Sequence, residues 1–173
     1  CVGRGVSGNV GIAVPVEAID NALQYLRNVY DSEQDSRRLP LNLKAGFAYY
    51  GDRKHVNMAT TAMGLLSLQL AGDFDSAYVR GSRDWLEANP PHWGQDWMFY
   101  GLYYYSQATY QLGGADAAKG FVRVKKLLLQ EQRPDGSWEA GNSYERNVGS
   151  VYSTSLALLA LCVKNHYLPI YQR

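Results

Sequence analysis

Three long stretches without a charged residue alternate with three amphipathic stretches, and this pattern constrains the fold more than any other feature of the sequence. The charge-free stretches span residues 56–72, 97–112 and 148–163. A helix that is apolar around its whole circumference is covered on all sides, whereas an amphipathic helix buries only one face. The alternation therefore predicts an all-α fold in two layers, with amphipathic helices outside and charge-free helices inside.

The amphipathic stretches cover about residues 16–31, 75–88 and 115–131. Their apolar residues recur with the helical period, and their charged residues gather on the opposite face. Asp75 and Asp96 stand before helical stretches, so we expect each to be an N-cap that accepts from the free N–H groups of the first turn. Charged residues in the connecting segments, such as Glu145, are expected to be solvated.

The turn from Gln132 to Trp138 reads Gln-Arg-Pro-Asp-Gly-Ser-Trp and follows the third amphipathic stretch. Pro lacks a backbone donor and Gly accepts positive φ, so this run ends a helix. The glutamine can bond to backbone groups left free at a helix end, and the tryptophan can stack over it. The pattern Gln-x-x-x-Gly-x-Trp, formed here by Gln132, Gly136 and Trp138, resembles the QW motif of the prenyltransferase and squalene oxidocyclase repeat family.

That resemblance implies an α/α toroid, in which outer and inner helices alternate around a central cavity. It covers three helical hairpins, at about residues 15–72, 73–114 and 115–166, within one helical-repeat domain (15–173) that follows an irregular segment (1–14). A closed toroid of this family contains about five to seven such pairs. We therefore expect an open or partial ring, completed by a missing N-terminal portion or by self-association.

The family's catalytic signatures are not found in this sequence. The Asp-x-Asp-Asp acid of the cyclases is absent, and Asp73-Phe74-Asp75, the nearest string, is better explained as a turn followed by a helix cap. Cys162 and His166 are one helical turn apart and form a weak candidate for the zinc site of the prenyltransferases, but no carboxylate is placed to join them. The Cys-Gly-Glu-Gln signature of the thioester proteins is also absent. We expect no metal and no cofactor, and the sequence leaves open whether the protein is an enzyme.

The second charge-free stretch is unusually rich in aromatic residues, which can bind apolar or cationic ligands. Most of these rings are expected to pack in the core, but one stripe of an inner helix must face the cavity. Thr60, Thr61 and Ser155 are further polar groups of the inner helices, and Asp52, His55, His92 and Asp96 lie in loops before them. The candidate ligand-binding residues are Trp97, Tyr100, Tyr103, Tyr104, Gln107, Tyr152 and Thr154.

Composition narrows the choice of partner. A net charge of +1 gives no reason to expect nucleic acid, and no uncharged apolar run is long enough for a membrane span. Two cysteines do not form a disulfide framework, and the cytoplasm is the favoured compartment. An isoprenoid or other hydrophobic ligand is the first expectation, a protein-interaction scaffold the second, and a carbohydrate-active enzyme on an (α/α)-barrel the third.

Overall fold

Helices account for all the regular secondary structure that the computed structural model describes, which covers residues 14–32, 39–40, 44–51, 55–141 and 143–165. Two isolated bridges, Tyr30 with Phe47 and Ala48 with Val56, are the extent of β-type pairing in these ranges. The expected all-α class is confirmed. The expected irregular segment up to residue 13, together with Asp52 and His166, lies outside the described residues.

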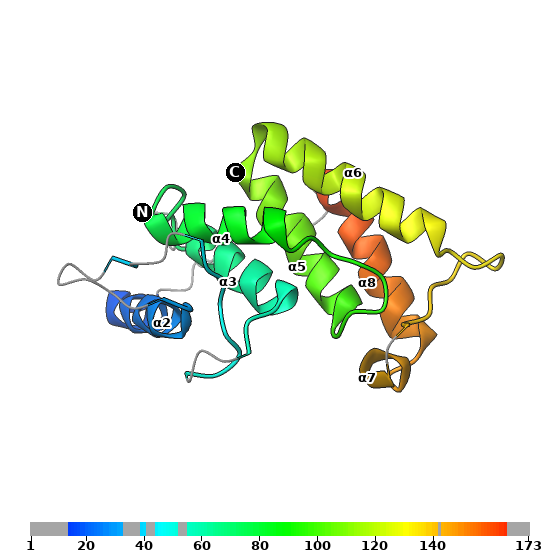
Figure 1. Ribbon diagram of the computed structural model, residues 1–173, viewed down its shortest axis with the longest axis horizontal. Coiled ribbons are helices and arrows are strands. Elements are labelled where there is room, and N and C mark those ends of the chain that lie inside the picture. Colours follow the sequence, from blue (N-terminus) through cyan, green and yellow to red (C-terminus); the bar gives the residue numbers. More distant parts are fainter. Residues whose placement is uncertain (1–13, 33–38, 41–43, 52–54, 142, 166–173) are drawn as a thin grey trace. The chain divides into compact units, whose positions relative to one another are not determined.

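The chain divides after Asn89 into two compact units. The boundary falls inside the second expected hairpin. The first unit contains α2 (Val16–Val29), α3 (Met58–Leu70) and α4 (Ala77–Ala88). The second contains α5 (Met98–Leu112), α6 (Gly114–Gln130), α7 (Ser143–Arg146), α8 (Ser150–Cys162) and a 3-10 turn, η1 (Val163–Asn165) (Figure 1).

In the first unit, α3 is buried around most of its circumference, as the charge-free stretch predicts. Leu65 and Leu68 are fully covered. The loop before α3 is fixed at Phe47, whose carbonyl accepts from the Thr60 hydroxyl (2.6 Å) and whose N–H donates to the Thr61 hydroxyl (3.1 Å). The hydroxyls of Thr60 and Thr61 are therefore used to anchor this loop.

The expected cap of α4 was wrong by one residue. Ser76 is the N-cap, and its hydroxyl accepts from the N–H of Val79 at 3.3 Å. Asp75 instead pairs on the surface with Arg80, its Oδ1 2.9 Å from Nη1. A serine hydroxyl serves a helix start as well as a carboxylate does, so Asp75 is left to the solvent.

In the second unit, α5 packs against both α6 and α8, and α6 also contacts α8. Figure 1 shows that α5 and α8 begin at the same end of this unit, where α7 also lies. The connection between α5 and α6 is very short, and Gly113 (φ 76°) and Gly114 (φ 49°) supply the positive φ values that it requires. A Cβ on Gly120 of α6 would lie 2.3 Å from the hydroxyl of Thr109 on α5, so a glycine there lets the two helices approach closely.

The expectation that α8 is covered on all sides was wrong. Its buried residues are Ser153, Ala157 and Ala160, whereas Val151 is 81% exposed and Leu158 is 50% exposed. The absence of charge predicted full coverage, but α5 and α6 contact only one side of this helix. The other side keeps an apolar surface open.

The turn from Gln132 to Trp138 forms hydrogen bonds both to the end of α6 and to α8. The Trp138 ring is buried, and its indole N–H donates to the carbonyl of Leu128 in the last turn of α6 at 2.8 Å. The backbone N–H of Trp138 donates to the hydroxyl of Thr154 on α8 at 3.1 Å. Gln132 donates to the carbonyl of Gly136 (φ 84°) at 2.9 Å and so closes the turn itself rather than a neighbouring helix.

Candidate functional site

The start of α5 is organised by a carboxylate from a distant part of the chain. Glu145 in α7 is fully buried (0% exposed), and its Oε2 and Oε1 accept from the N–H groups of Phe99 (3.1 Å) and Tyr100 (3.0 Å). A carboxylate at a helix N-terminus satisfies free donors and is stabilised by the helix dipole. The expectation that Glu145 is a solvated charge was wrong, because it caps α5 across 45 residues of sequence.

Asp96 was expected to be this cap and is not. The N-cap position of α5 is Trp97, which makes no side-chain capping bond, and Asp96 is exposed. Trp97 has φ 53° and is the non-glycine residue with positive φ in the described part of the chain. A bulky residue in this region is strained, and such strain is concentrated at functional sites.

The Trp97 ring is 44% exposed and stacks on the ring of Tyr144, which is 59% exposed. Their centroids are 5.9 Å apart and their planes differ by 20°. Tyr144 directly precedes Glu145, so the carboxylate that caps α5 also brings these two rings together. An exposed pair of large aromatic rings held by a buried anchor is typical of a binding surface.

Four half-buried tyrosines continue this surface. On α5, the ring of Tyr104 lies 4.9 Å from that of Tyr100 and 5.1 Å from that of Tyr103, both edge-to-face. Tyr152 on α8 donates its hydroxyl to Glu145 Oε1 at 3.2 Å. We call the six side chains together the aromatic surface: Trp97, Tyr100, Tyr103, Tyr104, Tyr144 and Tyr152.

Two tyrosine hydroxyls of this surface, those of Tyr104 and Tyr152, hold their protons more firmly than a free tyrosine does. Burial, together with the hydrogen bond and charge of Tyr100, raises the pKa of Tyr104 to about 12. Burial and the neighbouring Glu145 carboxylate raise the pKa of Tyr152 above its usual value. Near neutral pH these groups can donate hydrogen bonds but cannot act as bases. The arrangement is suited to binding.

The remaining predicted ligand residues lie beside this surface or are engaged elsewhere. Gln107 is buried one turn beyond Tyr103, and its Nε2 donates to the Tyr103 carbonyl at 3.3 Å. The Thr154 hydroxyl accepts from Trp138, and Ser155 is exposed on α8. The structure thus brings together the five predicted aromatic residues, and it adds Tyr144.

Of the candidate loop and metal residues, His55, His92 and Cys162 lie in the part of the chain that the structure describes, together with Asp96. His92 and His55 are exposed, and Cys162 is half-buried. Among the described residues, no three His, Cys, Asp or Glu side chains come together as a metal site.

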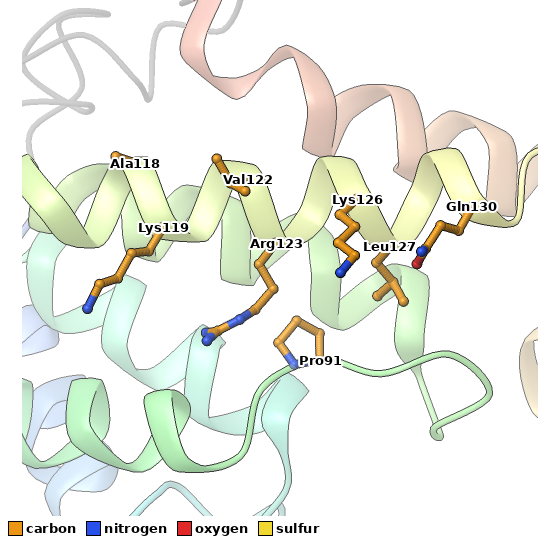
Figure 2. Close-up of a pocket in the computed structure, with 8 residues that line it drawn as sticks. All are labelled: Pro91, Ala118, Lys119, Val122, Arg123, Lys126, Leu127 and Gln130. Atoms are coloured by element: carbon orange, nitrogen blue, oxygen red, sulfur yellow. The ribbon is translucent and has the colours of Figure 1, made fainter.

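A groove along α6 is a second feature of this unit that the sequence did not predict. It has a volume of about 630 Å³, and Figure 2 shows Lys119, Arg123 and Lys126 along one side of α6, with Pro91 beside them. The lining contains these three cations and no carboxylate, and Val122 and Leu127 add apolar surface. The helical spacing of the three cations is visible in the sequence. That they line a groove depends on the position of Pro91, which the sequence does not give.

Sequence reasoning missed Glu145 and Tyr144 because both belong to the four-residue helix α7, which has no periodic signal of its own. Asp96 offered a local cap in the sequence, so no signal there pointed to a distant acceptor.

No protein-family model, no curated protein and no solved structure matches this chain. Within the described residues, none of the helices is both long and apolar enough to cross a membrane.

Proposed function

We propose that this protein binds an isoprenoid or another hydrophobic ligand through the aromatic surface, on a helical-repeat scaffold of the α/α toroid type. The observation that carries the proposal is the exposed stack of Trp97 on Tyr144, held next to the half-buried tyrosines of α5 and α8. Aromatic faces offer a large apolar contact and a few hydroxyl donors, which suits a lipid-like or aromatic ligand.

The toroid part of the proposal is supported by the alternation of amphipathic and charge-free helices and by the turn at Trp138. The open apolar side of α8 supports an incomplete ring. Sedimentation of the full chain tests whether copies of the chain complete the ring, since this predicts a dimer, and a monomer at all concentrations would contradict completion by self-association.

The ligand part is tested by calorimetric titration of the full chain with farnesyl diphosphate and geranylgeranyl diphosphate. Inorganic diphosphate is the control for binding by charge alone. We expect both prenyl compounds to bind and Trp97→Ala to weaken them about tenfold, because the variant loses the apolar area of the indole as well as an aromatic contact of about 0.5–1.5 kcal/mol.

A matched control is available in the first unit. Tyr49 and Tyr50 are also an exposed aromatic pair, with centroids 4.7 Å apart. Tyr50→Ala is expected to leave binding unchanged. Equal losses in Trp97→Ala and Tyr50→Ala, or equal binding of inorganic diphosphate, would contradict the proposal.

The groove along α6 favours a second function, a scaffold for an acidic partner. Its three cations without a lining carboxylate are complementary to an anionic amphipathic helix. A fluorescent Glu/Leu-patterned helical peptide should bind in low salt, and Lys126→Glu should abolish this, whereas Lys125→Glu, an exposed change outside the groove, should reduce binding much less. Binding of a Lys/Leu peptide with equal affinity would contradict the second function.

A further inference from the structure

A smaller pocket lies around the C-terminal half of α5, between that helix, α6 and the end of α8. Its volume is about 230 Å³. Alanine and valine side chains form much of the lining, and two aromatic residues, Tyr110 and Phe121, complete the apolar wall. Ser106 and Lys164 are its hydrogen-bonding side chains besides the Tyr110 hydroxyl. None of these residues belongs to the aromatic surface.

Ser106 lines the pocket and is more than nine-tenths buried. Its hydroxyl has no hydrogen-bond partner among the described residues. Buried polar side chains are nearly always hydrogen-bonded, and one without a partner carries a desolvation cost. A polar atom of a molecule held in the pocket would satisfy it.

Lys164 supplies a positive charge at the pocket. Its Nζ lies 4.6 Å from the centroid of the Phe121 ring, a cation–π contact. None of the ion pairs found among the described residues involves Lys164. The ammonium is exposed to solvent but held in place by the ring, so an anion can reach it from the pocket.

The volume limits the size of the ligand. An apolar cavity of about 150 Å³ accommodates benzene, whereas pockets for drug-sized ligands begin at about 300 Å³. The pocket lies between these values, which suits one aromatic ring with a short polar chain. It is too small for an isoprenoid of fifteen carbons.

We propose that this pocket binds a small aromatic monocarboxylate, with its carboxylate at Lys164, its ring against Phe121 and Tyr110, and a polar atom on the hydroxyl of Ser106. This inference does not depend on the function proposed for the aromatic surface.

The test is an NMR titration of the full, ¹⁵N-labelled chain with 3-phenylpropionate, 3-(4-hydroxyphenyl)propionate and 3-phenylpropylamine. Saturable shifts are expected at Ala160 and Val163 with both acids. The hydroxylated acid should bind about fivefold more tightly, since it offers the second polar group. The amine, with a similar apolar body and the opposite charge, should not saturate.

Two variants locate the contacts, and neither removes a hydrogen bond seen among the described residues. Lys164→Gln should weaken both acids about fivefold, and Lys125→Gln, an exposed change on α6 outside the pocket, should leave both unchanged. Ser106→Ala should abolish the preference for the hydroxylated acid. Equal binding of the amine, an unchanged preference in Ser106→Ala, or no saturable shift at Ala160 and Val163 would each overturn the proposal.

Discussion

Replacing Glu145 by alanine should destabilise the second unit strongly, because one buried carboxylate there serves three donors. These are the N–H groups of Phe99 and Tyr100 and the hydroxyl of Tyr152. Phe99 is fully buried, so its N–H would lose its acceptor away from water. An orphaned buried donor costs about 1–3 kcal/mol.

The magnitude follows from these contacts. We assign about 2 kcal/mol to the Phe99 N–H and about 1 kcal/mol to each of the two half-buried donors. The variant no longer has to bury a charge, which returns about 1 kcal/mol. The free energy of unfolding should therefore fall by about 3 kcal/mol. Glu145→Gln keeps one acceptor oxygen and should lose about half as much.

Urea denaturation followed by circular dichroism measures the loss, and hydrogen exchange locates it. The amides of Phe99 and Tyr100 should exchange roughly a hundredfold faster in Glu145→Ala. Glu139→Ala is the matched control, since Glu139 pairs with Arg133 on the surface, where an ion pair contributes at most about 1 kcal/mol. If Glu145→Ala behaved like Glu139→Ala and both amides kept their protection, the capping role of Glu145 would be refuted.

Three further outcomes are expected. Trp138→Ala should lower the free energy of unfolding by about 3–5 kcal/mol. Trp138→Phe should lower it by less, because phenylalanine retains most of the packing and loses only the hydrogen bond to Leu128. Equal losses of the two variants in urea titrations would show that packing is not the main contribution. Gly120→Ala should destabilise by about 1–3 kcal/mol through its clash with Thr109, despite the better helix propensity of alanine, and a rise in melting temperature would contradict the close approach of α5 and α6. In an alkaline titration followed by phenolate absorbance, Tyr104 should ionise near pH 12. Because the pKa of Tyr104 is raised in the folded state, its contribution to the free energy of unfolding is complete below about pH 10 and is lost between about pH 10 and 12. Tyr104→Phe should remove this part of the alkaline loss of stability.

The sequence was most informative where burial depends on local pattern. The charge-free stretches at 56–72 and 97–112 correspond to α3 and α5, and both are largely buried. The amphipathic stretch at 115–131 corresponds to α6, which buries Gly120, Val124 and Leu128 along one side. In each case the side chains of one helix are enough to decide which face avoids water.

The sequence was least informative where a contact joins distant segments. Nothing near Glu145 indicates that it accepts from the N–H groups of Phe99 and Tyr100, which lie 46 and 45 residues away, and a charged residue in a connecting segment is normally solvated. The positive φ of Trp97, next to these capped residues, likewise has no signal in the local sequence. The exposure of Val151 has a different origin. It arises because α5 and α6 contact the other side of α8, and the composition of α8 alone does not predict on which side its neighbours lie.

The tight packing of Trp138 has a practical consequence for spectroscopy. The chain has four tryptophans, and the indole of Trp138 is buried and hydrogen-bonded, whereas that of Trp97 is open to water. Their fluorescence should differ in colour and in quenching by iodide, with Trp138 emitting at shorter wavelength. In a variant whose two other tryptophans are replaced by phenylalanine, the emission spectrum would report separately on the contact of the Trp138 indole with α6 and on the exposed stack at Trp97.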